Sequence, residues 1–333
     1  MPEVRLGAQA TSPAALTWRG WTETLKRVWT NSGNHHVGLM SAGIAFYAFL
    51  SFVPLLGAIV MLYGLFADPA SVAEHMRLVI QVLPADAASL INEQLADLAL
   101  AATETKGIAL VIALGLSVVS ASRASGAIME SLNVIYEQQN TRGFLRGTIV
   151  SAVLIVAAVI IGLTGIAAAA LMGFANDFIG GGTALAPIVR SVIWVIAGAL
   201  CCFTLGAMYR FAPDRADARW QWLSVGAVVG TILWLIATVM FGIYAANFGN
   251  YDVTYGSLGA VAVLLMWLYV SAYAVLIGAM INAEAERQTA RDSTTGPELP
   301  LGHRGATVAD TSAALSRTPG DLANVGQTEE TSS

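Results

Sequence analysis

The sequence predicts an all-α polytopic membrane protein with six transmembrane helices, and three observations lead to that prediction. Hydrophobic residues make up 56% of the chain and charged residues only 12%, whereas soluble domains carry about 25% charged residues. The apolar residues form long blocks separated by short polar gaps. Lys and Arg fall almost entirely on alternate sides of these blocks.

Each apolar block is long enough to cross a bilayer, because a helix needs roughly 20 mostly apolar residues to span about 30 Å of hydrocarbon. The long uncharged runs favour helices over a β-barrel, whose strands alternate over about 10 residues. The expected spans are Gly38–Phe66, Gly107–Tyr136, Leu145–Met172, Leu185–Tyr209, Trp220–Ala246 and Gly256–Ile281.

Small residues recur at spacing four inside several spans. Such ridges let helix backbones approach closely in lipid, so they predict a compact bundle, with a moving seam as the alternative interpretation. The ridges are Gly226 and Gly230; Gly165, Ala169 and Gly173; and Gly198, Cys202 and Gly206.

The distribution of Lys and Arg predicts that both termini are cytoplasmic, by the positive-inside rule. The opposite side carries only Arg77, Lys106 and Arg190, and its first loop is acidic. The net charge of −5 therefore conceals a segregated pattern, and it gives no reason to expect a nucleic-acid partner. The basic residues on the expected cytoplasmic side are Arg5, Arg19, Lys26, Arg27, Arg142, Arg146, Arg210, Arg215, Arg219, Arg287 and Arg291.

The chain divides into three parts. Residues 1–37 form a cytoplasmic segment in which 18–31 predict a helix lying at the membrane surface, with a partner-binding helix as the alternative. Its apolar face is expected to hold Trp18, Trp21, Leu25, Val28 and Trp29.

The transmembrane domain is expected over 38–284 and includes an external loop, 67–106, of two amphipathic helices that form a cap or a lid. The polar composition of 285–333 predicts a cytoplasmic tail that is disordered from residue 290. We find no strong internal repeat, which weakens a transporter built from inverted repeats.

The motifs of several enzyme classes are absent from the sequence. There is no GxxxxGK[ST], HExxH or CxxC pattern, so an ATP-driven pump, a zinc peptidase and a thiol enzyme are not expected. His35 and His36 are adjacent and point to different sides of a helix, which argues against a metal site. Cys201 and Cys202 lack disulfide geometry and are expected to pack as small residues. We therefore expect no enzyme activity, cofactor or metal.

Polar residues gather toward the cytoplasmic ends of the spans. In the second span Ser120, Arg123, Glu130 and Glu137 share an arc of about 100°, with Asn133 at its edge. Ionisable groups at membrane depth are costly and raise a functional hypothesis by default. The alternative is that Arg123, about 25 Å from Lys106 along the helix, reaches the cytoplasmic interface.

These groups predict a polar cavity open to the cytoplasm. Pro54 in the first span predicts a kink near it. The residues expected to line the cavity are Ser41, Tyr47, Pro54, Arg123, Glu130, Asn133, Tyr209, Arg210, Asn282 and Glu284.

Several of these residues lie in stretches that resemble the BrkB/YihY family of bacterial inner-membrane proteins. The stretches are SAGIAFYAFLSFVPLL (41–56), AIMESLNVIYE (127–137), YRFAP (209–213), YGSLGAVAVLLMWLYVSAY (255–273) and LIGAMINAEAER (276–287). The six-span layout also agrees. One departure is Met280, where the family usually has Glu, so an ionic role there is absent or passes to Glu284.

The resemblance implies a location in the bacterial inner (plasma) membrane. It also carries names linked to virulence, serum resistance and the ribonuclease BN label for transfer-RNA processing. Metal-dependent phosphodiester cleavage needs a cluster of carboxylates or histidines facing soluble substrate, and the short cytoplasmic loops offer none. We therefore do not expect a nuclease.

Two functions compete. The first is a transporter-like protein that moves a small solute, lipid or ion without ATP through the cytoplasm-facing cavity. The second is a structural or regulatory cell-envelope protein whose bundle holds the external cap and recruits partners. The expected partners are membrane lipids and a small solute or ion, and the sequence makes no prediction of oligomeric state.

Overall fold

The computed structural model describes residues 7–66, 108–179, 185–247 and 257–315, and within these ranges it contains helices and no strand. The predicted all-α class is confirmed for this part of the chain. The elements are the 3-10 helix η1 (Pro13–Ala15) and the α-helices α2 (Trp18–Asn34), α3 (Val37–Phe66), α6 (Ile108–Ile135), α7 (Phe144–Ile179), α8 (Leu185–Phe211), α9 (Trp220–Asn247), α11 (Ser257–Glu286) and α12 (Thr307–Asp310).

The six long helices α3, α6, α7, α8, α9 and α11 coincide with the six predicted apolar blocks. Their long uncharged runs favour helix, because a helix satisfies every backbone polar group within the segment. Helix α3 continues through Pro54, whose side chain lies outside those described, so the predicted kink stays a prediction.

Three helices are long and apolar enough to cross a membrane among the residues searched: Pro187–Phe211, Trp220–Tyr244 and Val261–Glu286. Shorter apolar helices cover Val37–Ser51 and Phe144–Ala158. A multi-pass membrane protein is therefore supported, while six spans and the orientation of the termini stay predictions. The predicted external loop, 67–106, lies outside the described residues.

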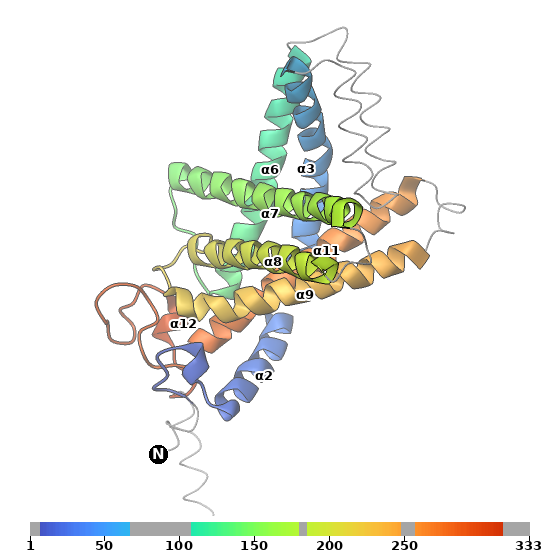
Figure 1. Cartoon of the computed structure of the whole chain (residues 1–333). Coiled ribbons are helices and arrows are strands. Elements are labelled where there is room, and N and C mark those ends of the chain that lie inside the picture. The colour runs from blue at the N-terminus through green and yellow to red at the C-terminus, as the bar shows by residue number, and fades with distance from the viewer. Residues whose placement is uncertain (1–6, 67–107, 180–184, 248–256, 316–333) are drawn as a thin grey trace, which may run out of the picture.

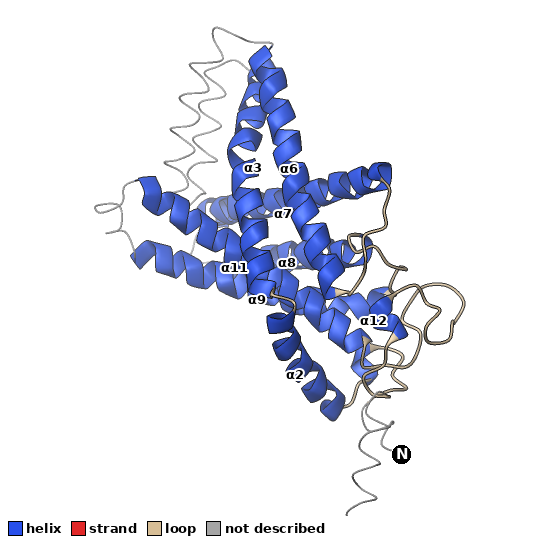
Figure 2. Cartoon of the chain, turned by 180° about the vertical axis from the view of Figure 1, so that it is seen from behind, coloured by secondary structure: helices blue, strands red, loops and turns tan. Residues whose placement is uncertain are grey.

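The six long helices pack against one another in a ring. Helix α6 packs against α7, α7 against α8, α8 against α9 and α9 against α11; α11 then packs against α3, and α3 packs against α6. Figures 1 and 2 show α3 and α6 side by side, with the other four long helices crossing this pair. Helix α11 is central, since it also contacts α2 and α12.

A close helix contact joins α9 to α11 through glycines. A Cβ atom at Gly226 would overlap the carbonyl oxygen of Gly278, and one at Gly230 would lie 3.0 Å from the Tyr209 hydroxyl and 3.5 Å from the Gly278 Cα. The predicted close approach at Gly226 and Gly230 is confirmed, because only glycine leaves room for the facing backbone.

Helix α2 confirms the helix predicted over 18–31. The Thr17 hydroxyl accepts a hydrogen bond from the Gly20 amide at 3.1 Å and caps its N-terminus. Of the predicted apolar face, Val28 is buried and Trp21 is half-buried, whereas Trp18, Leu25 and Trp29 are exposed. The face is thus divided between contacts with the protein and an open surface.

The structure differs from the predicted disordered tail over residues 290–315, which continue the ordered end of α11. This segment packs against the N-terminal segment and the α8–α9 connection: the Ala290 amide donates to the Ala8 carbonyl at 2.8 Å, and the Arg219 amide donates to the Ser293 carbonyl at 2.9 Å. Its order rests on buried polar contacts, which leave no apolar periodicity in the sequence. Residues 316–333 lie outside the described part.

Arg304 holds the C-terminal segment together from within. Its side chain is 4% exposed and donates to the carbonyl oxygens of Ala290, Leu299 and Ala309 at 2.8, 3.0 and 2.6 Å. We call the segments 7–17, 137–143, 212–219 and 287–315, with the helix ends that they cover, the polar assembly. Figure 1 shows its parts together at one end of the molecule.

Candidate functional site

The residues predicted to line a cavity fall into two groups in the structure. Arg123 and Glu130 are exposed on α6, and neither forms a hydrogen bond or ion pair with any residue in the described ranges. Tyr47 is 36% exposed on α3 and packs edge-on against Phe46. The structure does not bring these side chains together with the other described residues of the predicted cavity, which are buried or half-buried: Ser41, Asn133, Tyr209, Arg210, Asn282 and Glu284. The side chain of Pro54 lies outside those described.

Glu284 lies at the C-terminal end of α11 and is held by α2. Its carboxylate accepts hydrogen bonds from Arg27 Nε at 2.7 Å and from Asn31 Nδ2 at 2.8 Å. The Glu284 side chain is 2% exposed, so this ion pair is largely shielded from solvent. Within the described structure, Glu284 joins two helices rather than facing a cavity.

Glu286 forms a second buried ion pair, which the sequence did not single out. Both oxygens of its carboxylate accept from the Arg215 guanidinium, at 2.6 and 2.8 Å, and each side chain is 1% exposed. Ser293 also donates to this carboxylate. Burial lowers the pKa of Arg215, but the Glu286 carboxylate more than offsets it and the pKa is raised. The two residues are far apart in sequence, so no local pattern could have paired them.

Asn282 joins α11 to α9 beside the glycine contact. Its side-chain oxygen accepts from the Gly226 amide at 2.7 Å, and its Nδ2 donates to the Leu223 carbonyl at 3.1 Å. Nearby, the Tyr209 hydroxyl donates to the Val275 carbonyl at 2.7 Å. These two predicted residues are buried and have their polar groups directed to backbone.

Asn133 and Tyr136 form a polar corner at the C-terminal end of α6. The Asn133 side-chain oxygen accepts from the Asp214 amide at 2.7 Å, but its Nδ2 is buried without a partner in the described structure. The Tyr136 hydroxyl is also buried. It lies near Asn282, yet no described group completes a hydrogen bond to it. The Arg215 guanidinium covers the Tyr136 ring, 4.9 Å from its centroid.

The remaining predicted residues have local roles. Ser41 is buried and donates to the Val37 carbonyl, four residues earlier in α3, at 2.8 Å. Arg210 lies over the Trp220 ring at 5.2 Å and donates to the Ala218 carbonyl at 2.6 Å. Met280, which stands where the resembled family has Glu, is fully buried in the apolar core.

The Asp214 carboxylate connects the α8–α9 and α6–α7 connections. It accepts from the Thr141 amide and hydroxyl at 2.7 and 2.9 Å and pairs with Arg142 at 3.1 Å. Burial raises the pKa of the Asp214 carboxyl, but the Thr141 hydrogen bonds and nearby arginines outweigh it, so the pKa is lowered.

The pKa of Asp292 in the C-terminal segment is lowered in the same way. Burial raises this pKa, but hydrogen bonds from Leu299 and Thr294 and the charge of Arg304 outweigh burial, so the pKa is lowered. The charged form of each aspartate is therefore favoured by the folded chain.

The described residues offer no group of three or more His, Cys, Asp or Glu side chains placed to hold a metal ion. Chemically, the site is a set of buried ion pairs and a polar corner at the end of a helix bundle. Such an arrangement can lock helix ends together or line a path for a small polar species.

Comparison with known proteins identifies relatives over most of the chain. A family described as virulence factor BrkB matches residues 28–300. The putative ribonuclease-like protein YfkH of Bacillus subtilis is 30% identical over 266 residues, which cover 78% of this chain and 94% of YfkH. A UPF0761 membrane protein of Psychromonas ingrahamii is 25% identical over 268 residues, covering 78% of this chain and 86% of that protein. No solved structure matches the chain.

Proposed function

The chain belongs to the virulence factor BrkB family, and we propose that it is a transporter-like protein of the bacterial inner membrane. It moves a small solute, lipid or ion without ATP. The membrane part of this proposal is supported by the three long apolar helices and by the UPF0761 membrane proteins among its relatives. Both termini lie in the cytoplasm, because Lys and Arg concentrate on that side.

The observation that carries the proposal is a set of buried polar atoms without partners among the described residues. Asn133 Nδ2 and the Tyr136 hydroxyl lie at the end of α6, and the hydroxyls of Thr231 and Thr238 lie on α9. A buried polar group left unpaired costs about 1–3 kcal/mol. In native proteins such groups are normally satisfied by ordered water or an ion.

Tyr209 connects the two sets of unpaired atoms. It interacts with Tyr136 on one side, and on the other its hydroxyl approaches Gly230, the residue before Thr231 on α9. We call the series Asn133, Tyr136, Tyr209, Thr231 and Thr238 the polar lane. In the proposal it is hydrated and carries the transported species between α6, α8 and α9.

The ion pair between Arg215 and Glu286 closes the cytoplasmic end of the lane. The Arg215 guanidinium covers the ring of Tyr136 and is itself buried. Opening the lane to the cytoplasm then requires this pair to separate. The proposal keeps Asn133 and Tyr209 from the predicted cavity and replaces Arg123 and Glu130 with Tyr136 and Arg215.

A flux assay with the full chain in liposomes tests the proposal. The wild-type protein should carry protons or small solutes above the level of protein-free liposomes. Tyr136→Phe, which removes only the unpaired hydroxyl, should lower that flux at normal folded yield. Tyr273→Phe is the matched control, because Tyr273 is 37% exposed on α11. No flux from the wild type, or equal flux from all three proteins, would contradict the proposal.

A second candidate is a structural or regulatory envelope protein. It is favoured by the exposure of Arg123 and Glu130 and by the interlocking of both terminal segments in the polar assembly. The same assay separates the candidates, because this function predicts no flux. Neither candidate includes nuclease activity: the ribonuclease-like name belongs to YfkH, and both proposals rest on polar groups other than a metal-binding cluster.

A further inference from the structure

Helix α2 presents a strongly apolar face that the described protein leaves uncovered. Trp18 and Trp29 are 82% and 85% exposed, and Leu25 is 53% exposed. At 100° per residue these three side chains fall within an arc of about 40°. Tryptophan is rarely left so open on a protein in water, because burying its ring is strongly favourable.

Basic side chains flank this apolar arc on one side. Arg19 and Lys26 are exposed and lie at about 80–100° from Trp18 around the helix. Lys26 reaches Glu23 at 3.1 Å but keeps 72% of its side chain exposed. An apolar arc bordered by cations is the pattern of a helix that lies in the interface of an anionic bilayer.

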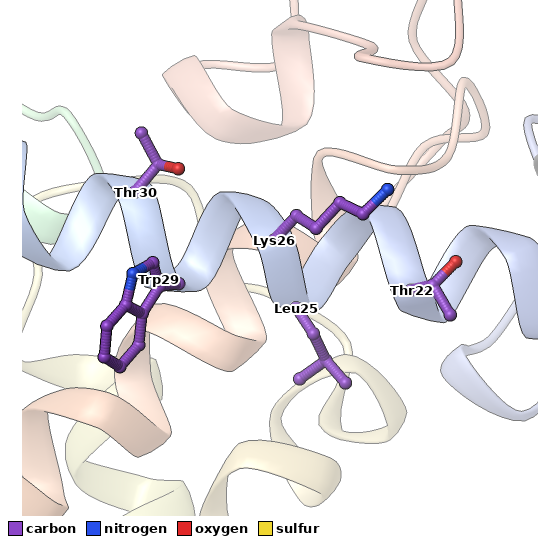
Figure 3. Close-up of a pocket in the computed structure, with 5 residues that line it drawn as sticks. All are labelled: Thr22, Leu25, Lys26, Trp29 and Thr30. Atoms are coloured by element: carbon purple, nitrogen blue, oxygen red, sulfur yellow. The ribbon is translucent and has the colours of Figure 1, made fainter.

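A shallow groove lies on α2 between the apolar arc and the basic side chains. It is lined by Thr22, Leu25, Lys26, Trp29 and Thr30. Figure 3 shows Leu25 and Trp29 on one side of α2 and Lys26 on the other flank. The groove therefore combines apolar surface with an ammonium group and hydroxyls. That combination suits the phosphate and the first methylenes of a phospholipid.

The opposite face of α2 fixes the direction in which the tryptophans point. Arg27 and Asn31 hold the Glu284 carboxylate of α11, and Thr24 and Val28 are buried. The helix cannot turn its tryptophans inward without breaking these contacts. The exposed arc is therefore a fixed surface of the folded chain.

The exposed arc also lies next to surface that lipid must cover. Only His35 and His36 separate α2 from α3, whose Leu39 is 75% and Phe46 52% exposed. A membrane protein covers such exposed apolar side chains of its long helices with lipid. The short connection therefore keeps α2 within reach of the bilayer surface.

We propose that α2 docks on the bilayer surface through Trp18, Leu25 and Trp29, with Arg19 and Lys26 contacting anionic headgroups. The occupant of this face is the lipid surface. Because Glu284 is held from the other side of α2, the docked helix also anchors the end of α11. This inference does not depend on transport.

The test places an environment-sensitive fluorophore on Thr22→Cys, which lines the groove between the apolar arc and Lys26, and on Asn140→Cys as a control in the polar assembly. Both are made in the full chain with Cys201 and Cys202 replaced by alanine. The protein is reconstituted into phosphatidylcholine vesicles with and without phosphatidylglycerol. Quenching is measured with headgroup spin-labelled lipid and with aqueous iodide.

The expected result is several-fold stronger lipid quenching and weaker iodide quenching at position 22 than at position 140. Adding Trp18→Gln and Trp29→Gln should abolish the difference, and Arg19→Gln with Lys26→Gln should remove its dependence on phosphatidylglycerol. Equal iodide quenching at both positions would overturn the proposal. Protection from iodide without lipid quenching would also overturn it, since a protein partner or second copy would then cover α2.

Discussion

Among single residues, Glu286 joins the end of α11 to two separate segments of the polar assembly. Its carboxylate binds Arg215 from the α8–α9 connection and Ser293 from the C-terminal segment. A buried charge is tolerated only when such partners replace the water it has lost. The ion pair therefore makes the fold dependent on both of its members.

Glu286→Gln should destabilise the protein by about 3–5 kcal/mol, because it leaves the buried Arg215 charge without its counter-charge. Thermal unfolding of the purified protein in detergent measures the loss. Glu298→Gln is the matched control, since Glu298 is exposed, and it should change stability by no more than about 0.5 kcal/mol. An equal, small effect of both substitutions would show that the ion pair does not support the fold.

Arg123→Ala and Glu130→Gln should leave folded yield and thermal stability close to wild type. Both side chains are exposed and unpaired in the described structure, and surface substitutions of this kind usually change stability by about 0.5 kcal/mol or less. Yield in membranes and unfolding temperature in detergent provide the measurement. A collapse of yield in either variant would mean that the side chain has a buried partner after all.

Among pairs of elements, the contact between α9 and α11 depends on the missing side chain of Gly226. Gly226→Ala should destabilise the protein, because the new methyl group would overlap the Gly278 carbonyl and the Asn282 side chain. Gly242→Ala on the same helix is the control, since nothing lies within 4 Å of its Cβ position. Alanine there should be neutral or stabilise by up to about 1 kcal/mol. If the two variants changed the unfolding temperature by the same amount relative to wild type, the close contact at Gly226 would be contradicted.

The connections between helices should be sensitive to acid. Asp214 and Asp292 have pKa values lowered by folding, so their stabilising effect is complete above the ordinary value of about 3.9. It is lost as the pH falls below that value, because the unfolded chain then binds protons that the folded chain does not. Unfolding temperatures should therefore drop between about pH 5 and about pH 3. Asp214→Asn with Asp292→Asn should be less stable at neutral pH and show a smaller drop.

Sequence reasoning succeeded where the determining signal is local. The six long helices follow from uncharged apolar runs, and the close approach of a neighbouring helix at Gly226 follows from its spacing to Gly230. The identity of that neighbour, α11, does not follow from the spacing. Sequence reasoning failed where two distant segments meet. In the sequence Arg215 is only a topology signal and Glu286 belongs to no informative pattern, because their pairing depends on how α11 and the α8–α9 connection fold together.

For the whole molecule, the two terminal segments close the polar assembly jointly. The Thr289 hydroxyl donates to the Ala10 carbonyl at 2.6 Å, and Gln221 Nε2 donates to the Thr11 carbonyl at 2.9 Å. The Gly305 carbonyl accepts from the Ala216 amide at 3.0 Å. Because these are backbone and polar contacts, composition alone made the C-terminal segment resemble a disordered tail.

Truncation tests whether the C-terminal segment 287–315 is an ordered part of the polar assembly or a disordered tail. A chain that ends after Glu286 loses Ser293, Arg304 and the backbone partners of the N-terminal segment, so buried polar groups near Ala8 and Arg215 become unpaired at about 1–3 kcal/mol each. Its folded yield and unfolding temperature should therefore fall well below wild type. A chain that ends after Leu315 keeps every described contact and should fold with wild-type yield. Equal stability of the two truncations would mean that residues 287–315 do not support the fold. That is the result expected if this segment were a disordered tail.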